Sequence, residues 1–410
     1  MTPTSGIEFL VWLLIAAAVI AMLAKRLQIP YTVSLVLGGL LLGIIRLPIL
    51  SPLQPGHRPD WLTPDVILIL FLPALVFEGS VKLDARKLVR NFVPLLLLAN
   101  VGVLTAALVT GYLVHWLLGL PVLIALLFGS IISATDPISV LAIFKDLKVN
   151  ERLSLILEAE SLLNDGTAVV LFGILFGAVA AQRSTVPEAI GQYFLAVAGG
   201  AVLGLACGYL ASRATETVDD PQIEITLTTI LAYGSYLLAH RLHVSGVIAT
   251  ACAGLTLGSF GAKKGMSIRT RAAMQSFWEY VSFVMNSLVF LLIGLEIDVR
   301  KLLQNWSSVV LAIGAVVLGR AVSIYLLVPL SNRFAEKIPV RWQHAAVWGG
   351  LRGALALALA LSLESAFPYR AQILNLTFGV VIFSIVVQGL TIKPFLSAIK
   401  LADGETATPA

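Results

Sequence analysis

Long apolar stretches separated by short polar loops occupy almost the whole chain, and they predict an all-α polytopic membrane protein. A helix needs about 20 mostly apolar residues to cross the hydrocarbon core of a bilayer. Thirteen segments fit this reading, of which the second and ninth are short: 7–24, 30–45, 64–81, 92–118, 121–144, 153–181, 187–212, 222–240, 244–258, 273–297, 306–332, 340–363 and 371–399. We expect one membrane domain over residues 1–400 and a short cytoplasmic tail over 401–410.

Composition supports this reading and excludes other classes of protein. Of 410 residues, 58% are hydrophobic and 12% are charged, whereas soluble domains contain about 25% charged residues. A soluble globule of this size would lack the polar residues to cover its surface. Soluble enzymes, nucleic-acid binders, disordered chains and disulfide scaffolds are therefore excluded, and the environment of this chain is a lipid bilayer.

The distribution of Lys and Arg predicts the orientation of the chain. Nineteen of the 28 basic residues fall in loops that follow odd-numbered spans or at the C-terminal end, and seven fall in the other loops. Basic residues concentrate in cytoplasmic loops of membrane proteins. We expect the N-terminus outside, the C-terminus in the cytoplasm and the chain in the cell (inner) membrane.

A few ionisable residues lie where a bilayer should exclude them. Each costs about 2.5–3.5 kcal/mol at a helix centre on insertion scales. Four acids and two arginines lie deep in the expected spans: Glu78, Asp136, Glu160, Asp165, Arg320 and Arg352. Two arginines neutralise at most two acids, so a proton or a metal cation is the natural partner of the others. Glu158 lies nearer the cytoplasmic end of its span, where a helix-end carboxylate and a functional group are both consistent with its position.

Two spans carry helix-breaking sequences near their middle. Span 5 contains Thr135-Asp136-Pro137, and span 12 contains the segment 349–353, Gly-Gly-Leu-Arg-Gly. Pro cannot donate a backbone hydrogen bond and disfavours helical geometry in the residue before it. Spans 5 and 12 are seven apart, which is the register of two inverted repeats, spans 1–6 and 8–13, joined by span 7. Paired interrupted helices of this kind indicate a transporter's binding site near the bilayer midplane.

Span 6 carries a polar strip two columns wide. Glu160 and Asn164 are four residues apart, as are Ser161 and Asp165, and residues at this spacing share a helix face. Together with the carbonyl groups freed in span 5, these side chains supply only oxygen ligands. Hard cations prefer oxygen, whereas soft metals prefer Cys or several His. The strip therefore fits a monovalent cation or a proton.

These motifs, in this order along the chain, resemble those of the monovalent cation:proton antiporters, specifically the NhaP-type Na⁺/H⁺ antiporters and their sodium/hydrogen exchanger relatives. The resemblance rests on Thr135-Asp136-Pro137, on residues 160–165 (Glu-Ser-Leu-Leu-Asn-Asp), on residues 71–78 (Phe-Leu-Pro-Ala-Leu-Val-Phe-Glu) and on residues 349–354 (Gly-Gly-Leu-Arg-Gly-Ala). It extends over all thirteen spans. It implies a secondary active transporter, with no enzymatic reaction and no cofactor, whose transported substrates are Na⁺ and H⁺.

The resemblance also implies roles for individual residues. Asn164 and Asp165 would form an Asn-Asp pair at the cation- and proton-binding site, in which Asp165 carries the cation and the proton in turn. Thr135 and Ser161 would be cation ligands, and Glu78 a nearby carboxylate. Asp136 would neutralise the unwound part of span 5. Glu160 would pair with a basic residue; we favour Arg320, which leaves Arg352 to compensate the broken helices, although the sequence does not exclude the reverse.

The same resemblance implies a homodimer in which a core bundle moves against a dimerisation bundle. The core would include spans 3, 5, 6, 11, 12 and 13, and the dimerisation bundle spans 1, 7 and 8. An Asn in place of a second Asp before Asp165 implies electroneutral exchange of one proton per cation. In span 7, the spacing of Gly200, Gly204 and Gly208 favours close packing within the protein, with a dimer interface as the alternative.

Three rival functions differ from this reading. A K⁺/H⁺ antiporter stays open, because selectivity among monovalent cations depends on cavity size and dehydration, which residue identity does not report. A cation channel is disfavoured, since channel filters are commonly assembled around a symmetry axis, whereas here the polar residues gather within one chain. An intramembrane protease is disfavoured because the spans contain no Gly-x-Gly-Asp or Gly-x-Ser-x-Gly motif.

Overall fold

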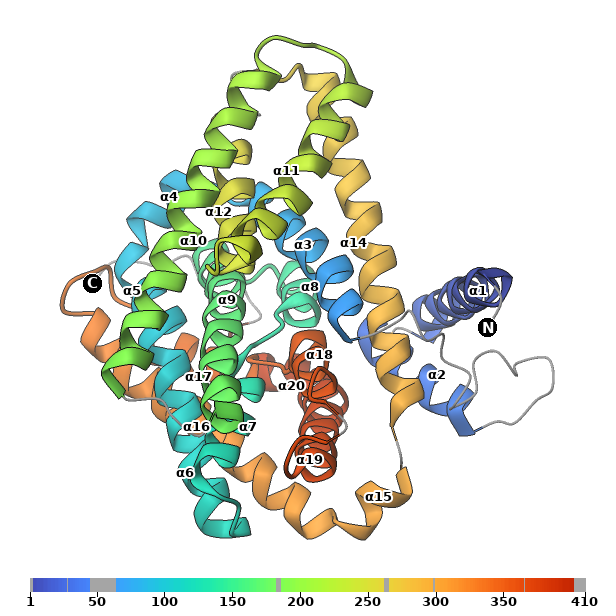
Figure 1. The fold of residues 1–410 in the computed structure, drawn as a ribbon, viewed down its shortest axis with the longest axis vertical. Helices are drawn as coiled ribbons and strands as arrows, with labels where there is room; N and C mark the ends of the chain where they lie inside the picture. Colours follow the sequence, from blue (N-terminus) through green and yellow to red (C-terminus); the bar gives the residue numbers. More distant parts are fainter. Residues whose placement is uncertain are drawn as a thin grey trace.

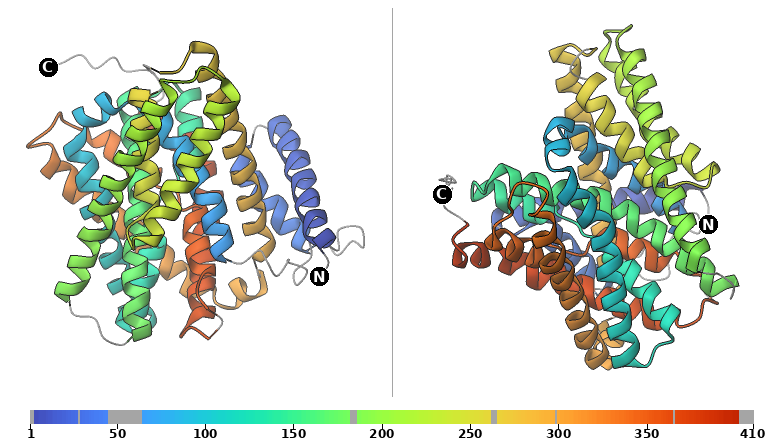
Figure 2. Two further views of the ribbon diagram at one scale, coloured as in Figure 1. Left: turned by 45° about the horizontal axis from the view of Figure 1, so that its top comes forward. Right: turned by 90° about the vertical axis from the view of Figure 1, so that its left-hand side faces the viewer.

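The computed structural model describes residues 3–27, 29–44, 64–181, 186–261, 265–297, 299–364 and 366–401. All regular elements within these residues are helical, which confirms the all-α class. Most of the long helices run roughly parallel to one another in side view (Figure 2). This arrangement is the one expected of helices that cross a bilayer side by side.

The helices follow one another with short connections. The N-terminal half contains α1 (Pro3–Leu27), α2 (Tyr31–Ile44), α3 (Pro64–Lys82), α4 (Ala85–Arg90), α5 (Phe92–Leu96), a π-helical segment (Leu97–Gly102), α6 (Val103–Leu118), α7 (Val122–Ser133), α8 (Ile138–Asp146), α9 (Glu151–Ala181) and α10 (Val186–Thr215). The C-terminal half contains α11 (Pro221–Arg241), α12 (Gly246–Thr256), a second π-helical segment (Leu257–Gly261), α14 (Ile268–Glu296), α15 (Val299–Gln304), α16 (Trp306–Ser331), α17 (Val340–Trp348), α18 (Ala354–Leu361), α19 (Arg370–Ile382), a third π-helical segment (Phe383–Gln388) and α20 (Gly389–Ala398).

Each expected span coincides with a helix or with consecutive helical segments of the described residues. Seven continuous stretches are long and apolar enough to cross a membrane: Ile7–Leu27, Phe92–Leu118, Glu151–Ala180, Val186–Thr215, Ile268–Glu296, Trp306–Ser331 and Arg370–Ala398. The total of thirteen spans and their orientation stay predictions. Part of the sequence used to derive them lies outside the described residues, namely the tail at 402–410 and Arg46, Arg58, Arg183, Lys263 and Lys264.

The helices pack in two groups that meet along α9 and α18, which lie near the centre of the ribbon view (Figure 1). The first helix group consists of α1, α2, α3, α10, α11, α12 and α14. The second consists of α5 to α8 and α16 to α20, and α9 packs against members of both. α3, which the sequence analysis grouped with the core spans, packs mainly against α12 and α14, so by its contacts it lies in the first group.

Close contact between α10 and α12 depends on three glycines of α10. A Cβ atom added to any of them would lie 2.2–2.7 Å from a backbone oxygen of α12 or of its N-cap residue Ser245. The pairs are Gly200 with Ser245, Gly204 with Ala249 and Gly208 with Ala253. These distances are too short for any side chain. The glycine spacing therefore serves packing within the chain, which is the reading that the sequence favoured.

Replacing Gly204 with Ala is expected to destabilise the protein, because its added Cβ atom would overlap the α12 backbone. Overpacking of this kind costs about 1–3 kcal/mol. Gly314→Ala is the matched control, since a Cβ atom at Gly314 in α16 would have no neighbour within 4 Å; it should raise stability by about 0.5–1 kcal/mol through helix propensity. Thermal unfolding of the detergent-purified variants measures both, and equal shifts would contradict the packing described for α10 and α12.

Candidate functional site

Two helices are interrupted at the centre of the molecule, at the positions that the sequence predicted. α7 ends at Ser133 and α8 begins at Ile138, while α17 ends at Trp348 and α18 begins at Ala354. The backbone at Ala134 is extended, with φ −61° and ψ 141°. Unwound residues leave backbone donors and acceptors without helical partners, and at membrane depth these groups need other partners.

The interrupted segments find partners in each other and in Ser384 of the third π-helical segment. The backbone N–H of Asp136 donates to the carbonyl oxygen of Leu351 over 2.7 Å, and the backbone N–H of Arg352 donates to Ser384 Oγ over 2.8 Å. A Cβ atom at Gly353 would lie 2.4 Å from Cβ of Asp136. Only glycine allows this approach, so the two broken helices cross in direct contact.

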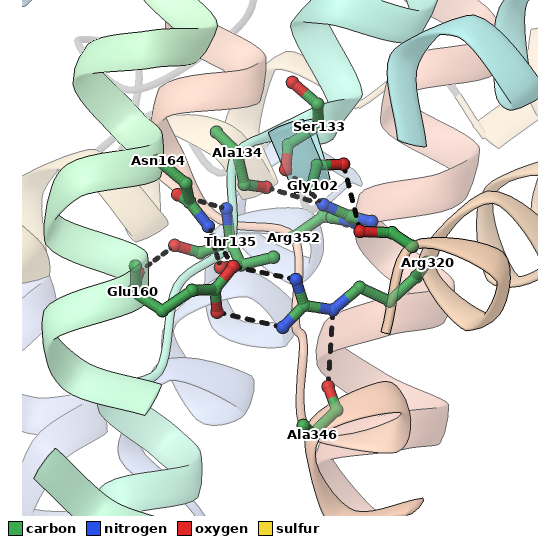
Figure 3. A network of polar contacts seen from close by, with 11 residues as sticks. Gly102, Ser133, Ala134, Thr135, Glu160, Asn164, Arg320, Ala346 and Arg352 are labelled. Atoms are coloured by element: carbon green, nitrogen blue, oxygen red, sulfur yellow. Dashed lines mark hydrogen bonds and ion pairs between the residues drawn. The ribbon is translucent and has the colours of Figure 1, made fainter. Parts of the chain in front are cut away.

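Arg352 stabilises the end of α7. Its Nη1 donates to the carbonyl oxygens of Ser133 and Ala134, at 2.7 and 3.1 Å (Figure 3). The last carbonyls of a helix carry the negative end of its dipole, and a cation there is stabilising. The guanidinium is buried, with 3% of Arg352 exposed. Arg352 thus contacts the broken helix directly, as the sequence analysis proposed.

Glu160 and Arg320 form a buried ion pair. Arg320 Nη1 and Nη2 donate to Glu160 Oε1 and Oε2 over 2.8 and 2.9 Å, and Arg320 Nε donates to the carbonyl oxygen of Ala346 over 3.3 Å (Figure 3). Glu160 is 1% and Arg320 6% exposed. This bidentate geometry, with two parallel hydrogen bonds, is the strongest arrangement of an Arg and a carboxylate. Of the two pairings that the sequence allowed, the structure contains the favoured one.

Asn164 joins α9 to the break between α7 and α8. Its Nδ2 donates to Glu160 Oε1 over 2.9 Å and to Thr135 Oγ1 over 2.7 Å, while its Oδ1 accepts the backbone N–H of Thr135 over 3.3 Å. Ser161 Oγ donates to the carbonyl oxygen of Thr135. Residues from both polar columns of α9 therefore help to hold the unwound segment.

A cavity of about 340 Å³ lies between the two helix groups. α3 and α14 form one wall, and the α7–α8 break, α9 and α18 form the other. Four acids line it, with four neutral polar residues and an otherwise apolar surface: Glu78, Asp136, Glu158 and Asp165, then Thr135, Ser161, Ser282 and Asn286. None of the described residues that line it is Lys or Arg. The side chains that line the cavity therefore supply carboxylate groups and other oxygen ligands.

α9 presents its two polar columns to different surroundings. Glu158, Ser161 and Asp165 line the cavity, whereas Asn164 and Glu160 are turned to Thr135 and Arg320. Neighbouring residues in a helix differ by about 100° in direction, which separates Asp165 from Asn164. Within the described part of the chain, no residue donates a hydrogen bond to Asp165 or forms an ion pair with it. The sequence predicted both columns but not that only one of them faces the cavity.

Glu78 has a basic partner one residue beyond the span expected at 64–81. Lys82, four residues later in α3, contacts Glu78 Oε1, and its Nζ lies 3.1 Å from Glu279 Oε1 of α14. The four-residue spacing of Glu78 and Lys82 was the signal in the sequence that could have predicted this ion pair.

Asp136 Oδ1 accepts the backbone N–H of Ile138 over 3.0 Å. Among the described residues, Asp136 and Asp165 are the two deep acids without an ion pair.

Sequence reasoning also missed two cavity residues of α14, Ser282 and Asn286. Both are polar positions within an expected span, which was the signal that would have found them. Glu158, for which two readings were open, lines the cavity.

Comparison with known proteins identifies the family. The sequence model described as "Sodium/hydrogen exchanger, transmembrane" matches residues 13–398. The chain belongs to this family. It is 39% identical to the Na(+)/H(+) antiporter NhaH of Halobacillus aidingensis over 97% of this chain and 98% of that protein. It is 40% identical to the Na(+)/H(+) antiporter NhaG of Bacillus atrophaeus, over 93% of this chain and 72% of that one.

A solved structure shares the exchanger fold. The sodium proton antiporter MjNhaP1 from Methanocaldococcus jannaschii superposes with a TM-score of 0.80 at 22% identity, covering 98% of this chain and all of that one. At this identity the comparison speaks to the fold alone. The predicted class, an all-helical NhaP-type membrane protein, is confirmed.

Removing one member of the Glu160–Arg320 pair is expected to be strongly destabilising. Arg320→Met leaves a buried carboxylate without its partner, which costs about 3–5 kcal/mol, and adding Glu160→Gln should restore part of that loss. The control is Arg213→Met, because the Arg213–Glu216 pair is short, at 2.6 Å, but its arginine is 63% exposed; such surface pairs contribute about 0–1 kcal/mol. Similar thermal-unfolding shifts for Arg320→Met and Arg213→Met would contradict this account.

Proposed function

We propose that the protein exchanges Na⁺ for H⁺ across the membrane by competition of the two ions for Asp165. The observation that carries the proposal is the position of Asp165, which lines an acidic cavity while Arg320 and Arg352, the buried arginines of the described residues, bond to other groups. The relatives with about 40% identity are named Na(+)/H(+) antiporters. A carboxylate without an ion pair is stabilised in such a cavity by binding either a proton or a cation.

The proposed cation site combines Asp165 and Glu78 with the oxygens of Thr135 and Ser161. All are hard ligands suited to Na⁺, and all four residues line the same cavity. Asp165 is the better candidate for the carrier, because Glu78 is already in contact with Lys82. Asn164, Glu160 and Arg320 act as supporting residues, because Asn164 bonds the backbone N–H and the hydroxyl of Thr135 and is itself bonded to the Glu160–Arg320 pair. Na⁺ is the transported substrate, and no cofactor takes part.

Transport requires that the cavity open to each side in turn. In our proposal the first and second helix groups move relative to each other, and the crossing of the broken helices travels with the second group. The protein works as a homodimer in the cell (inner) membrane, with its N-terminus outside and its C-terminus in the cytoplasm. One titrating carboxylate exchanges one proton for one cation, so the exchange is electroneutral.

The Asp165→Asn variant is expected to lose cation-driven proton movement, because an amide neither binds a proton in this pH range nor supplies the negative charge. The measurement is dissipation of an imposed pH gradient in everted membrane vesicles on addition of Na⁺, Li⁺ or K⁺, which also tests K⁺/H⁺ exchange. The matched control is Glu151→Gln at the exposed start of the same helix, with a side chain 92% exposed. Full activity of Asp165→Asn would exclude Asp165 as the carrier.

The apparent affinity for Na⁺ should weaken as pH falls. Protons and Na⁺ exclude each other at Asp165, so each tenfold rise in proton concentration raises the half-saturating Na⁺ concentration by up to about tenfold once the proton-bound form dominates. Initial exchange rates in proteoliposomes, titrated with Na⁺ at several pH values, measure this. A half-saturating concentration independent of pH would contradict direct competition.

A further inference from the structure

Ser282 and Asn286 form a polar pair in the α14 wall of the cavity to which the mechanism above assigns no role. They lie one helical turn apart, and both line the cavity that contains Asp165. They are buried, with 8% and 7% of their surfaces exposed. Val289, the next cavity residue along α14, is apolar. The wall opposite α9 is thus polar at this level and apolar beyond it.

The amide of Asn286 is only half satisfied. Its Nδ2 donates to Ser282 Oγ over 3.3 Å, but its buried Oδ1 accepts no hydrogen bond from any residue that the structure describes. A buried amide oxygen without a partner is unfavourable, and an apolar residue of similar size would avoid that cost. At 3.3 Å the one hydrogen bond is long, so it opposes rotation of the amide about Cβ–Cγ only weakly.

The depth of this pair follows from the ion pair at the end of α3. Glu279 of α14 lies 3.1 Å from Lys82, and Glu78 is one turn deeper in α3. Ser282 and Asn286 follow Glu279 by three and seven residues on the same helix face, so Asn286 lies about 10 Å further along α14. Glu279, Ser282 and Asn286 therefore form a continuous polar strip that leads from the Lys82 ion pair into the cavity.

We propose that Asn286, oriented by Ser282, is a ligand for the transported monovalent cation from the first helix group. This inference rests on the proposed function and adds a residue to the site. An amide oxygen is a hard ligand, and it adds to the ligands proposed above, which are Asp165, Glu78, Ser161 and Thr135. The cation then bridges α9 and α14. A proton on Asp165 brings no ion that needs a shell of oxygen ligands, so the proton-loaded state does not depend on the Asn286 oxygen in the way that the cation-loaded state does.

This arrangement predicts a specific signature. Loss of the Asn286 oxygen weakens cation binding and leaves proton binding at Asp165 unchanged. Asn286→Leu should therefore raise the half-saturating Na⁺ concentration by roughly tenfold, equivalent to about 1.4 kcal/mol. The change in half-saturation per pH unit should stay as in the wild type. Ser282→Ala removes only the orienting hydroxyl, so it should produce a smaller shift in the same direction.

The test uses Na⁺ titration of the full-length protein in proteoliposomes, with Ser287→Ala as control. Ser287 is the neighbour of Asn286 on α14, but its hydroxyl contacts Tyr31 of α2 and does not line the cavity. The control should keep the wild-type half-saturation. The proposal is overturned if the wild type shows saturable Na⁺ exchange and Asn286→Leu has the same half-saturating Na⁺ concentration. If Asn286→Leu does not fold, a Ser282→Ala variant with the wild-type half-saturating concentration overturns it.

Calorimetric titration of the purified protein with NaCl separates this inference from the proposed function. Binding of Na⁺ to the wild type that weakens in Asn286→Leu supports the subsite even if vesicles show no exchange. Exchange by the wild type with unaltered Na⁺ binding in Asn286→Leu leaves the proposed function intact and excludes Asn286 as a ligand.

Discussion

Backbone polar groups within a bilayer need partners inside the protein, and the centre of this molecule is organised by that requirement. Breaking α7–α8 and α17–α18 exposes amides and carbonyls at the depth where water is scarce. The two breaks satisfy each other through Asp136 N–H and the Leu351 carbonyl, and Arg352 covers the end of α7. Because Gly353 packs against Asp136, the crossing has little freedom to shift. The backbone carbonyls of the α7–α8 break and the carboxylates of Asp136 and Asp165 are thereby held close to the same cavity.

The charged residues around this crossing are of two kinds: those that support the structure through ion pairs, and Asp165, whose carboxylate can bind an ion. Glu160 and Arg320 neutralise each other and fix Asn164, which in turn holds the unwound Thr135. Asp165, on the neighbouring face of α9, takes no part in these bonds. The same helix thus bonds the broken segment through Asn164 and Ser161 and exposes the carboxylate of Asp165 to the cavity. A buried pair costs desolvation energy, so its value here is better explained by the geometry it imposes than by stability.

Much of this site could be predicted because its elements have local sequence causes. Pro137 and the glycines at 349, 350 and 353 mark the breaks, and four-residue spacing marks the polar columns of α9. Contacts between distant segments could not be predicted in the same way. Lys82 reaches both Glu78 and Glu279, and the grouping of α3 with α12 and α14 depends on which apolar faces fit each other. The apolar faces of membrane helices have similar compositions, so which helices pack together depends on how well the shapes of their surfaces fit.

By itself, the sequence determined that this is an all-helical membrane protein, where two of its helices break, and which acids lie too deep for a bilayer to tolerate without a partner. These properties follow from length, apolar composition and backbone chemistry, which act locally. Only the tertiary structure decided that Glu160 pairs with Arg320 and that Asp165 faces the cavity with no ion pair to any residue that the structure describes. It also brought Asn286 of α14 to the same cavity. Which buried charges are neutralised is a matter of distances between helices, and those distances exist only once the helices have packed.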